Sequence, residues 1–146
     1  MNMIKRANTE DVKVLADLAI HLWADNDPQD LEAEFLKLAK NDEAACFITC
    51  VDGEPIAFAQ CQLRHDYVEG TESSPVGYLE GIFVSEGYRQ HGHAAELLAA
   101  CERWAREKGC TEFASDCELG NADSVKFHLS LGFEEANRII CFRKDL

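Results

Sequence analysis

The spacing of apolar residues along the chain predicts helices and strands in alternation. Leu31, Phe35 and Leu38 recur at helical spacing after Asp27-Pro28, a pair that commonly starts a helix. Two apolar runs flank Asp52-Gly53, which is a strong signal for the turn of a β-hairpin. The hydrophobic pattern therefore predicts a chain that contains both helices and an antiparallel pair of strands.

Extending this reading over the whole chain gives a mixed α/β fold. The predicted strands are Met3–Arg6, Ala45–Val51, Glu54–Arg64, Tyr78–Val84, Thr111–Asp116 and Ile139–Arg143, and the predicted helices are Glu10–Trp23, one starting at Asp27-Pro28, Gly92–Lys108 and Asn121–Leu131. Asn8 or Thr9 can cap the first helix, and Gly109 and Gly132 stop the last two. We expect one domain over residues 1–146, with a mixed central sheet flanked by helices and closed by the strand Ile139–Arg143.

Charge and composition exclude some classes of function. The formal net charge of −13 argues against nucleic acid, whose phosphates need a basic face. It favours a cationic partner, or else serves only solubility. The chain has no apolar run long enough to span a membrane and no signal peptide, so we expect a cytoplasmic protein. The seven cysteines include no Cys-x-x-Cys pair, and we expect neither disulfides nor a metal site.

The segment Gly77–Ala94 carries the strongest chemical signal. It reads as a buried strand, a turn and the start of a helix, and its turn Arg89-Gln90-His91-Gly92-His93-Ala94 has the form Arg-x-x-Gly-x-Ala. Free backbone N–H groups and the positive end of the helix dipole can hold a phosphate there. Gly92 lets the backbone approach an anion, and Arg89 can add positive charge. The pattern predicts a ligand that carries phosphate.

This segment resembles the cofactor motif of the GCN5-related N-acetyltransferases (GNAT). Asn121–Phe133, an Asn-led helix that ends in Leu-Gly-Phe, resembles a later motif of that family. Arg64–Val84, together with Trp23 and Ala114-Ser115-Asp116, is similar to the aminoglycoside 6′-N-acetyltransferases. The resemblance covers essentially the whole chain and implies a homodimer that uses acetyl-CoA to acetylate a cationic aminoglycoside. It also implies that the central strand and the next one splay apart, leaving a cleft between Ile82–Val84 and Ala114–Asp116.

The same resemblance assigns a cofactor site. The backbone of Ile82, Phe83 and Val84 would pair with the amide-rich pantetheine arm of acetyl-CoA, as an added strand pairs with a sheet edge. The amides of Arg89, Gln90, His91, Gly92, His93 and Ala94 would take its pyrophosphate. Asn121 either lies beside the cofactor or only caps the last helix.

Two carboxylates are the candidates for deprotonating and orienting the amine. Asp116 ends an apolar strand at the rim of the expected cleft, and Glu80 interrupts another apolar strand. A carboxylate in a buried strand is costly unless it is paired or bound to a cation. We interpret Asp116 as the general base and Glu80 as a partner that orients the ammonium, the alternative being an exposed edge or a structural ion pair.

The resemblance implies further contacts with the acceptor. Trp23 offers a flat face for a sugar ring or a cation, or else packs in its helix, and Tyr67 matches a substrate contact. Asn137 stands where related enzymes often have an acid. His128 occupies the position of a Tyr that in many acetyltransferases protonates the leaving thiolate, so it either does this work or is an idle packed residue.

Three functions remain open at this point. The first is an aminoglycoside 6′-N-acetyltransferase that transfers the acetyl group directly in a ternary complex. The second keeps the fold and changes the acceptor to another small amine or a peptide N-terminus. The third is a non-catalytic acyl-CoA-binding module in which Asp116 and Glu80 are merely structural.

Overall fold

A single five-stranded sheet forms the centre of the molecule. The computed structural model describes residues 1–146. Its strands are β1 (Asn2–Arg6), β2 (Ala44–Val51), β3 (Glu54–Arg64), β4 (Val76–Val84) and β5 (Phe113–Ala114), and they lie side by side in that order. Neighbours from β1 to β4 are antiparallel, while β5 runs parallel to β4. The predicted mixed sheet is confirmed.

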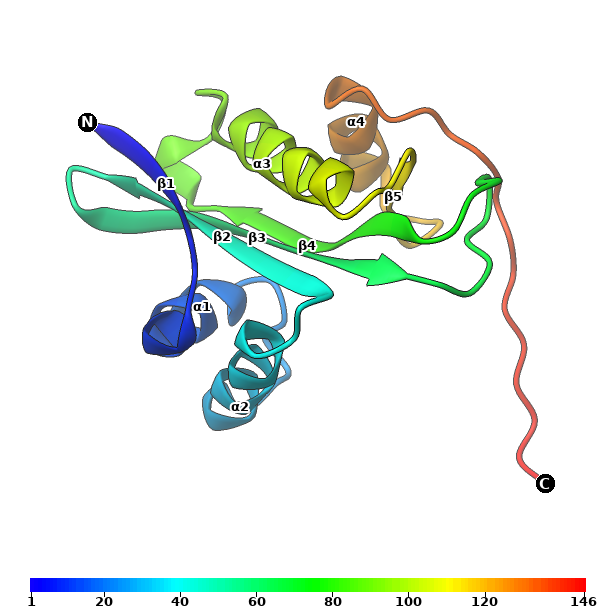
Figure 1. Ribbon diagram of the computed structural model, residues 1–146, viewed down its shortest axis with the longest axis horizontal. Coiled ribbons are helices and arrows are strands. Elements are labelled where there is room, and N and C mark those ends of the chain that lie inside the picture. Colours follow the sequence, from blue (N-terminus) through cyan, green and yellow to red (C-terminus); the bar gives the residue numbers. More distant parts are fainter.

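Helices cover both faces of the sheet. They are α1 (Val12–Ala19), α2 (Pro28–Ala39), α3 (His93–Glu107) and α4 (Ala122–Ser130), with short 3-10 turns at Thr9–Asp11 and Glu86–Tyr88. The helices α1 and α2 lie on one face, and α3 and α4 lie on the other (Figure 1). None of these helices is long and apolar enough to cross a membrane.

Strand alternation divides the core between the two faces. On β2, Ala45 and Phe47 belong to the buried cluster under α3, whereas Cys46 and Ile48 belong to the cluster under α1 and α2. Successive side chains of a strand point to opposite faces, so a strand buried on both sides becomes an unbroken apolar run. The sheet is thus a rigid layer between two apolar clusters, and it fixes the position of whatever its strand ends carry.

Several local predictions are confirmed. The side chain of Asn8 caps the N-terminal turn in a capping box with Asp11, and Asp27 caps α2 with Pro28 behind it. Asp52 and Gly53 have φ values of 51° and 85° between β2 and β3. Positive φ at both central residues is the requirement of the tight hairpin turn that Asp-Gly predicts.

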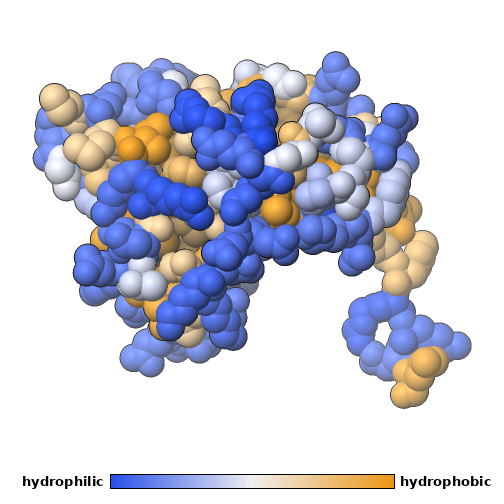
Figure 2. All heavy atoms as spheres, viewed as in Figure 1, coloured by the Kyte–Doolittle hydropathy of each residue, from blue (hydrophilic) through white to orange (hydrophobic).

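The C-terminal prediction was wrong. Ile139–Arg143, expected to close the sheet, forms no strand, and residues 134–146 have no regular structure. This segment extends away from the sheet (Figure 1) and stands apart from the largely hydrophilic body on the face shown in Figure 2. The neighbouring strand is also shorter than predicted, because Thr111–Asp116 is reduced to Phe113–Ala114. A two-residue strand offers few backbone partners, so nothing within this copy holds a further strand there.

The first helix is also shorter than expected. It was predicted to run from Glu10 to Trp23, but it begins as a 3-10 turn at Thr9 and its α-helical part ends at Ala19. Backbone bonds from Leu22 and Trp23 to the Ala19 carbonyl continue the chain as turns. Trp23 therefore sits in a turn beside the sheet.

Candidate active site

The last two strands of the sheet, β4 and β5, diverge after a short paired segment. β4 and β5 pair only at Gly77–Phe113 and Tyr78–Ala114, so both chains continue beyond this point without further strand pairing. From Leu79 onward, the edge of β4 that faces away from β3 has no strand partner. Unpaired backbone groups along such an edge can bond to an extended ligand that carries amides. The expected divergence is present, and Ser115 and Asp116 lie directly at its start.

A β-bulge places Glu80 at the same point. The register pairs Gln60 with Gly81 but Cys61 with Leu79, which leaves Glu80 as the extra residue of β4. Its carboxylate is bonded by Arg64 at the end of β3, with Nε to Oε2 at 3.1 Å and Nη2 to Oε1 at 2.9 Å. The Glu80 side chain is 18% exposed and that of Arg64 is 39% exposed. This bidentate ion pair supplies the cation that a half-buried carboxylate needs.

Tyr78 links this ion pair to Asp116. The Arg64 guanidinium carbon lies 3.5 Å from the centroid of the Tyr78 ring, an arrangement that favours a cation over an aromatic face. The Tyr78 hydroxyl donates a hydrogen bond to Oδ2 of Asp116. Burial, followed by this bond and the charge of Asp116, raises the pKa of Tyr78, so the hydroxyl stays protonated and remains a donor. Residues from β3, β4 and the end of β5 thereby hold both carboxylates in place.

Ser115 and His128 form a second polar pair on the opposite face of the sheet. Ser115 Oγ lies 2.8 Å from Nε2 of His128 in α4, and Nδ1 of His128 lies 2.7 Å from the main-chain oxygen of Ser124. The rings of Phe133 and Phe127 flank the imidazole at centroid distances of 5.3 and 6.0 Å. Ser115 and Asp116 are adjacent in sequence, yet one bonds to α4 and the other to Tyr78 across the sheet. The start of the divergence thus carries a proton-binding side chain on each face.

The turn before α3 is built to expose backbone donors. Gly92 has a φ of 85° and is the N-cap of α3, and no side chain caps the helix there. The first N–H groups of the helix therefore have no side-chain partner and point at the surface. Nε of Arg89 donates to the Val84 carbonyl at 2.9 Å, which fixes this side chain beside the end of β4. The side chain of His93 is buried and its Nδ1 has no partner.

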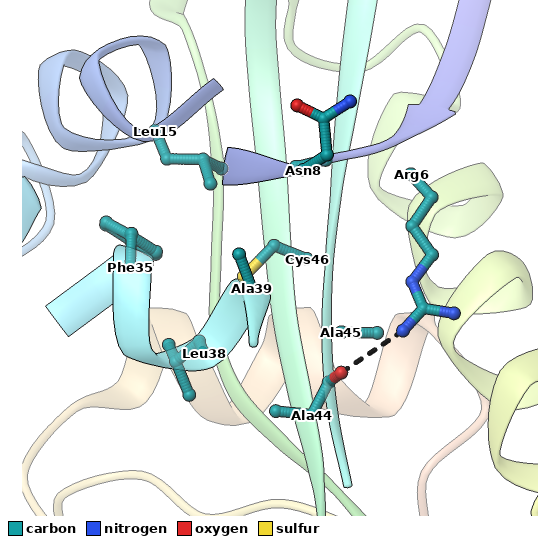
Figure 3. A pocket seen from close by; sticks show the side chains of 10 residues that line it. Arg6, Asn8, Leu15, Phe35, Leu38, Ala39, Ala44, Ala45 and Cys46 are labelled. Atoms are coloured by element: carbon teal, nitrogen blue, oxygen red, sulfur yellow. Dashed lines mark hydrogen bonds between the residues drawn. The ribbon is translucent and has the colours of Figure 1, made fainter. Parts of the chain in front are cut away.

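A large cavity of about 1190 Å³ opens along β5 and α4. Of the predicted site residues, Tyr67, Asp116, His128 and Asn137 line it, together with Arg64, Tyr78 and Ser115. A smaller cavity of about 330 Å³ lies between α2 and β2, lined mostly by apolar side chains such as Leu15, Phe35 and Leu38 (Figure 3). Its one charged lining residue, Arg6, bonds to the Ala44 carbonyl at 3.3 Å, and it holds none of the predicted site residues.

Comparison with known proteins agrees with this geometry. Residues 12–133 match the family described as "Acetyltransferase (GNAT) family". The chain belongs to this family. It is 39% identical to the aminoglycoside N(6')-acetyltransferase type 1 of Serratia marcescens, with 99% of each chain covered, and 43% identical to the protein of the same name from Salmonella enteritidis, with 97% of each covered.

Solved structures show the same GNAT fold. The chain superposes on AAC(6')-Iy in complex with the bisubstrate analog CoA-S-monomethyl-acetylneamine with a TM-score of 0.95 and 41% identity, covering 100% of this chain and 99% of the other. It superposes on the aminoglycoside 6'-N-acetyltransferase AAC(6')-Ih from Acinetobacter baumannii with a TM-score of 0.95 and 35% identity, again covering 100% and 99%. The expected acetyltransferase fold is confirmed.

Two predicted site residues, Trp23 and Asn121, make packing and capping contacts within the fold. Trp23 packs edge-on against Phe58, with ring centroids 6.1 Å apart, and a Cβ on Gly81 would come within 2.7 Å of the Trp23 ring. It therefore rests on β4 and does not line the large cavity. Oδ1 of Asn121 accepts from the Ser124 N–H at 3.0 Å, so this residue does cap α4. Each contact agrees with the packing or capping alternative and leaves part of the side chain exposed.

Sequence reasoning missed Arg64, Tyr78 and Ser115. Tyr78 lies two residues before the bulge residue Glu80 on one strand, and Arg64 is the cation at the end of the neighbouring predicted strand. A half-buried Glu80 needs a cation, and this need could have pointed to Arg64. Whether that cation is Arg64 or a group of the ligand could be decided only from the register of β3 with β4. Asn137 also has an internal partner, because its Nδ2 donates to Glu69. No group of three or more His, Cys, Asp or Glu side chains is placed to hold a metal ion.

Proposed function

We propose that this protein transfers the acetyl group of acetyl-CoA to the 6′-amine of aminoglycosides. The observation that carries the proposal is the position of Asp116, an exposed carboxylate held by Tyr78 where β4 and β5 diverge, on the wall of a large cavity. The names of relatives that are 39–43% identical over nearly the whole chain support the substrate class. A GNAT fold alone would support only the reaction type.

The proposed cofactor site follows the free edge of β4. The backbone of Ile82, Phe83 and Val84 pairs with the pantetheine arm, and the amides of the turn Arg89–Ala94 hold the pyrophosphate. The uncapped N-terminus of α3 and the positive φ of Gly92 support this assignment. Asn121 lies at the start of α4 and adds a polar contact beside the cofactor. AAC(6')-Iy, a similar structure, is known in complex with CoA.

The proposed acceptor site is rich in negative charge. Asp116, Tyr67 and Asn137 line the cavity, and the chain as a whole carries a formal charge of −13, which attracts a polycationic sugar. Glu80 orients an ammonium group in this proposal, and it shares its charge with Arg64. Trp23, which rests on β4 outside the cavity, offers the exposed part of its ring to a sugar or a cation in this proposal.

The proposed chemistry is direct transfer within a ternary complex. The ammonium of the acceptor loses a proton to Asp116, directly or through water, and the free amine attacks the thioester carbonyl carbon. The attacking nitrogen releases its remaining extra proton to water, the electron pair on the oxyanion re-forms the carbonyl, the C–S bond breaks, and the sulfur leaves with its electrons. His128 lies on the other face of the sheet from Asp116 and assists proton transfer to the departing sulfur in this proposal.

A thiol-release assay tests this function. We expect the purified protein with acetyl-CoA to release CoA when kanamycin A is added and to release none with a similar aminoglycoside that has a hydroxyl at the 6′ position. Release with both would point to another amine of the antibiotic. Release only with spermidine or peptide amines would move the protein to another acceptor class, and CoA binding without turnover of any amine would indicate a binding module.

We further propose that the protein is a homodimer whose second copy covers the C-terminal segment. Ile139, Ile140 and Phe142 are 58%, 74% and 91% exposed, an unusual density of bare apolar surface within a few residues. A second copy of the chain would bury these side chains. We expect the mass from light scattering to be that of a dimer, and the double change Ile140→Asp with Phe142→Asp to shift it toward a monomer.

The control for this experiment is Leu36→Asp, which places the same charge on a partly exposed leucine of α2. A double variant that stays dimeric would refute the role of the segment, and a monomeric wild-type protein would refute the dimer.

We propose that residues 1–146 act as one acetyltransferase domain, in the cytoplasm. All seven cysteines are free thiols, which suits a reducing compartment.

A further inference from the structure

A side-chain hydrogen bond joins Ser115 to His128, and the main chain of α4 holds the imidazole on its other side. The oxygen of a main-chain carbonyl only accepts hydrogen bonds, so Nδ1 of His128, 2.7 Å from the Ser124 oxygen, carries a hydrogen in every protonation state. Nε2 is therefore the position that gains and loses a proton. It faces Ser115 Oγ at 2.8 Å. A hydroxyl, an imidazole and a group that orients the imidazole form the arrangement by which proteins move protons at a reacting atom.

Protonation of His128 reverses the direction of this hydrogen bond. In the neutral imidazole, Ser115 donates its hydrogen to Nε2. In the imidazolium, Nε2–H donates to Oγ, and the hydroxyl hydrogen of Ser115 is released to point elsewhere. Ser115 Oγ lies 3.5 Å from the Leu79 carbonyl oxygen. The side chains of Ser115 and His128 both line the large cavity. The charged state of His128 thus prepares Ser115 as a donor to a group in the cleft.

The location matches the leaving side of the reaction. Ser115 is the first residue after the last β4–β5 pair, so its hydroxyl lies at the start of the divergence. Asp116, the next residue, bonds to Tyr78 on one face, whereas Ser115 bonds to α4 on the other. In the acetyl transfer proposed above, Asp116 is therefore available to the incoming amine on the first face, and Ser115 is available to the departing sulfur on the second.

We propose that Ser115 is the catalytic acid that protonates the departing CoA thiolate, and that His128 acts through it as a positioning and proton-supplying residue. This inference rests on the acetyl transfer proposed above. As the C–S bond breaks, its electron pair goes to sulfur, the hydroxyl proton of Ser115 moves to sulfur, and the Nε2 proton of His128 moves to Oγ. The products are the amide, the CoA thiol, a protonated Asp116 and a neutral His128; Asp116 returns its proton to solvent and His128 takes one up before the next turnover.

The experiment compares Ser115→Ala, His128→Gln and the double variant under saturating substrates. We expect each single change to lower kcat about a hundredfold, near the lower end for proton transfer by a side chain, with KM for acetyl-CoA and for the amine within about twofold. Because the two residues form one relay, the double variant should lose no more than either single variant. Ser115→Thr keeps the hydroxyl and should restore most of kcat.

The matched control is Ser130→Ala, which removes an exposed hydroxyl of α4 that bonds only within its own helix. Losses that multiply in the double variant would overturn the relay, as would a raised KM with unchanged kcat in Ser115→Ala. The relay concerns the thiolate, so these variants are equally informative with any amine that the wild type acetylates. A wild type inactive on aminoglycosides but active on another amine would refute the proposed substrate alone, and one inactive on every amine would refute both proposals.

Discussion

Replacing Asp116 by Asn is expected to lower kcat about a thousandfold, within the range found when a general base is removed. The Tyr78 hydroxyl donates to Oδ2 of Asp116, and the amide oxygen of Asn can accept the same bond. The variant therefore keeps the shape and the anchoring of the side chain. What it loses is the ability to take a proton from the ammonium of the acceptor. Thiol release at saturating acetyl-CoA and aminoglycoside gives kcat directly.

The control for this change is Asp17→Asn, an exposed carboxylate on α1 whose contact is the surface ion pair with Lys13. It removes the same charge far from the divergence and should leave kcat within about twofold. If Asp116→Asn raised KM for the aminoglycoside and left kcat unchanged, Asp116 would bind the acceptor without acting as a base. Glu80, which is already paired with Arg64, would then be the next carboxylate to test.

Replacing Phe58 by Ala is expected to lower the free energy of unfolding by about 3–5 kcal/mol, the usual cost of removing a buried aromatic side chain. Phe58 is 0% exposed and lies edge-on to two rings, with centroids 6.0 Å from Phe35 and 6.1 Å from Trp23. The change leaves a cavity between the sheet and the helices α1 and α2. It also removes the support of Trp23, which packs on Gly81 next to the bulge at Glu80.

Urea denaturation followed by circular dichroism measures this loss. Leu36→Ala is the matched control, because Leu36 follows the buried Phe35 on α2 but is 38% exposed, and its change should cost about 0.5 kcal/mol. A loss below about 1 kcal/mol for Phe58→Ala would mean that the surrounding rings collapse into the space. A fall in aminoglycoside affinity in the folded variant would show that Trp23 needs this support to keep its place.

Local signals predicted most of the scaffold. Asn8 and Asp27 each satisfy backbone N–H groups within a few residues, and Asp52-Gly53 supplies the positive φ values that its turn demands. These effects depend on neighbours in sequence, so they can be read before the fold is known. The motif at Arg89–Ala94 is of the same kind, because a helix start and a glycine together produce exposed donors. The assignment to the GNAT family followed from such segments.

The predicted strand Ile139–Arg143 shows where prediction from local sequence fails. Its apolar residues have the composition of a strand, but a strand also needs a partner edge along its length. β5 is only Phe113–Ala114, and in this copy the segment stays exposed. The composition of Ile139–Arg143 could not reveal the length of β5, because that length depends on how far β5 stays paired with β4.

The amino-acid sequence was sufficient to define most of the elements, the family and the carboxylates Asp116 and Glu80 as candidates, since each depends on local chemistry or on a contiguous motif. The partners of those carboxylates were decided by the tertiary structure. Arg64 meets Glu80 because of a one-residue bulge in the pairing of β3 with β4, and Ser115 meets His128 because α4 packs beside the divergence. A shift of one residue in a strand moves every side chain to the other face. Contacts between distant segments therefore depend on register and packing, which no short stretch of the chain contains.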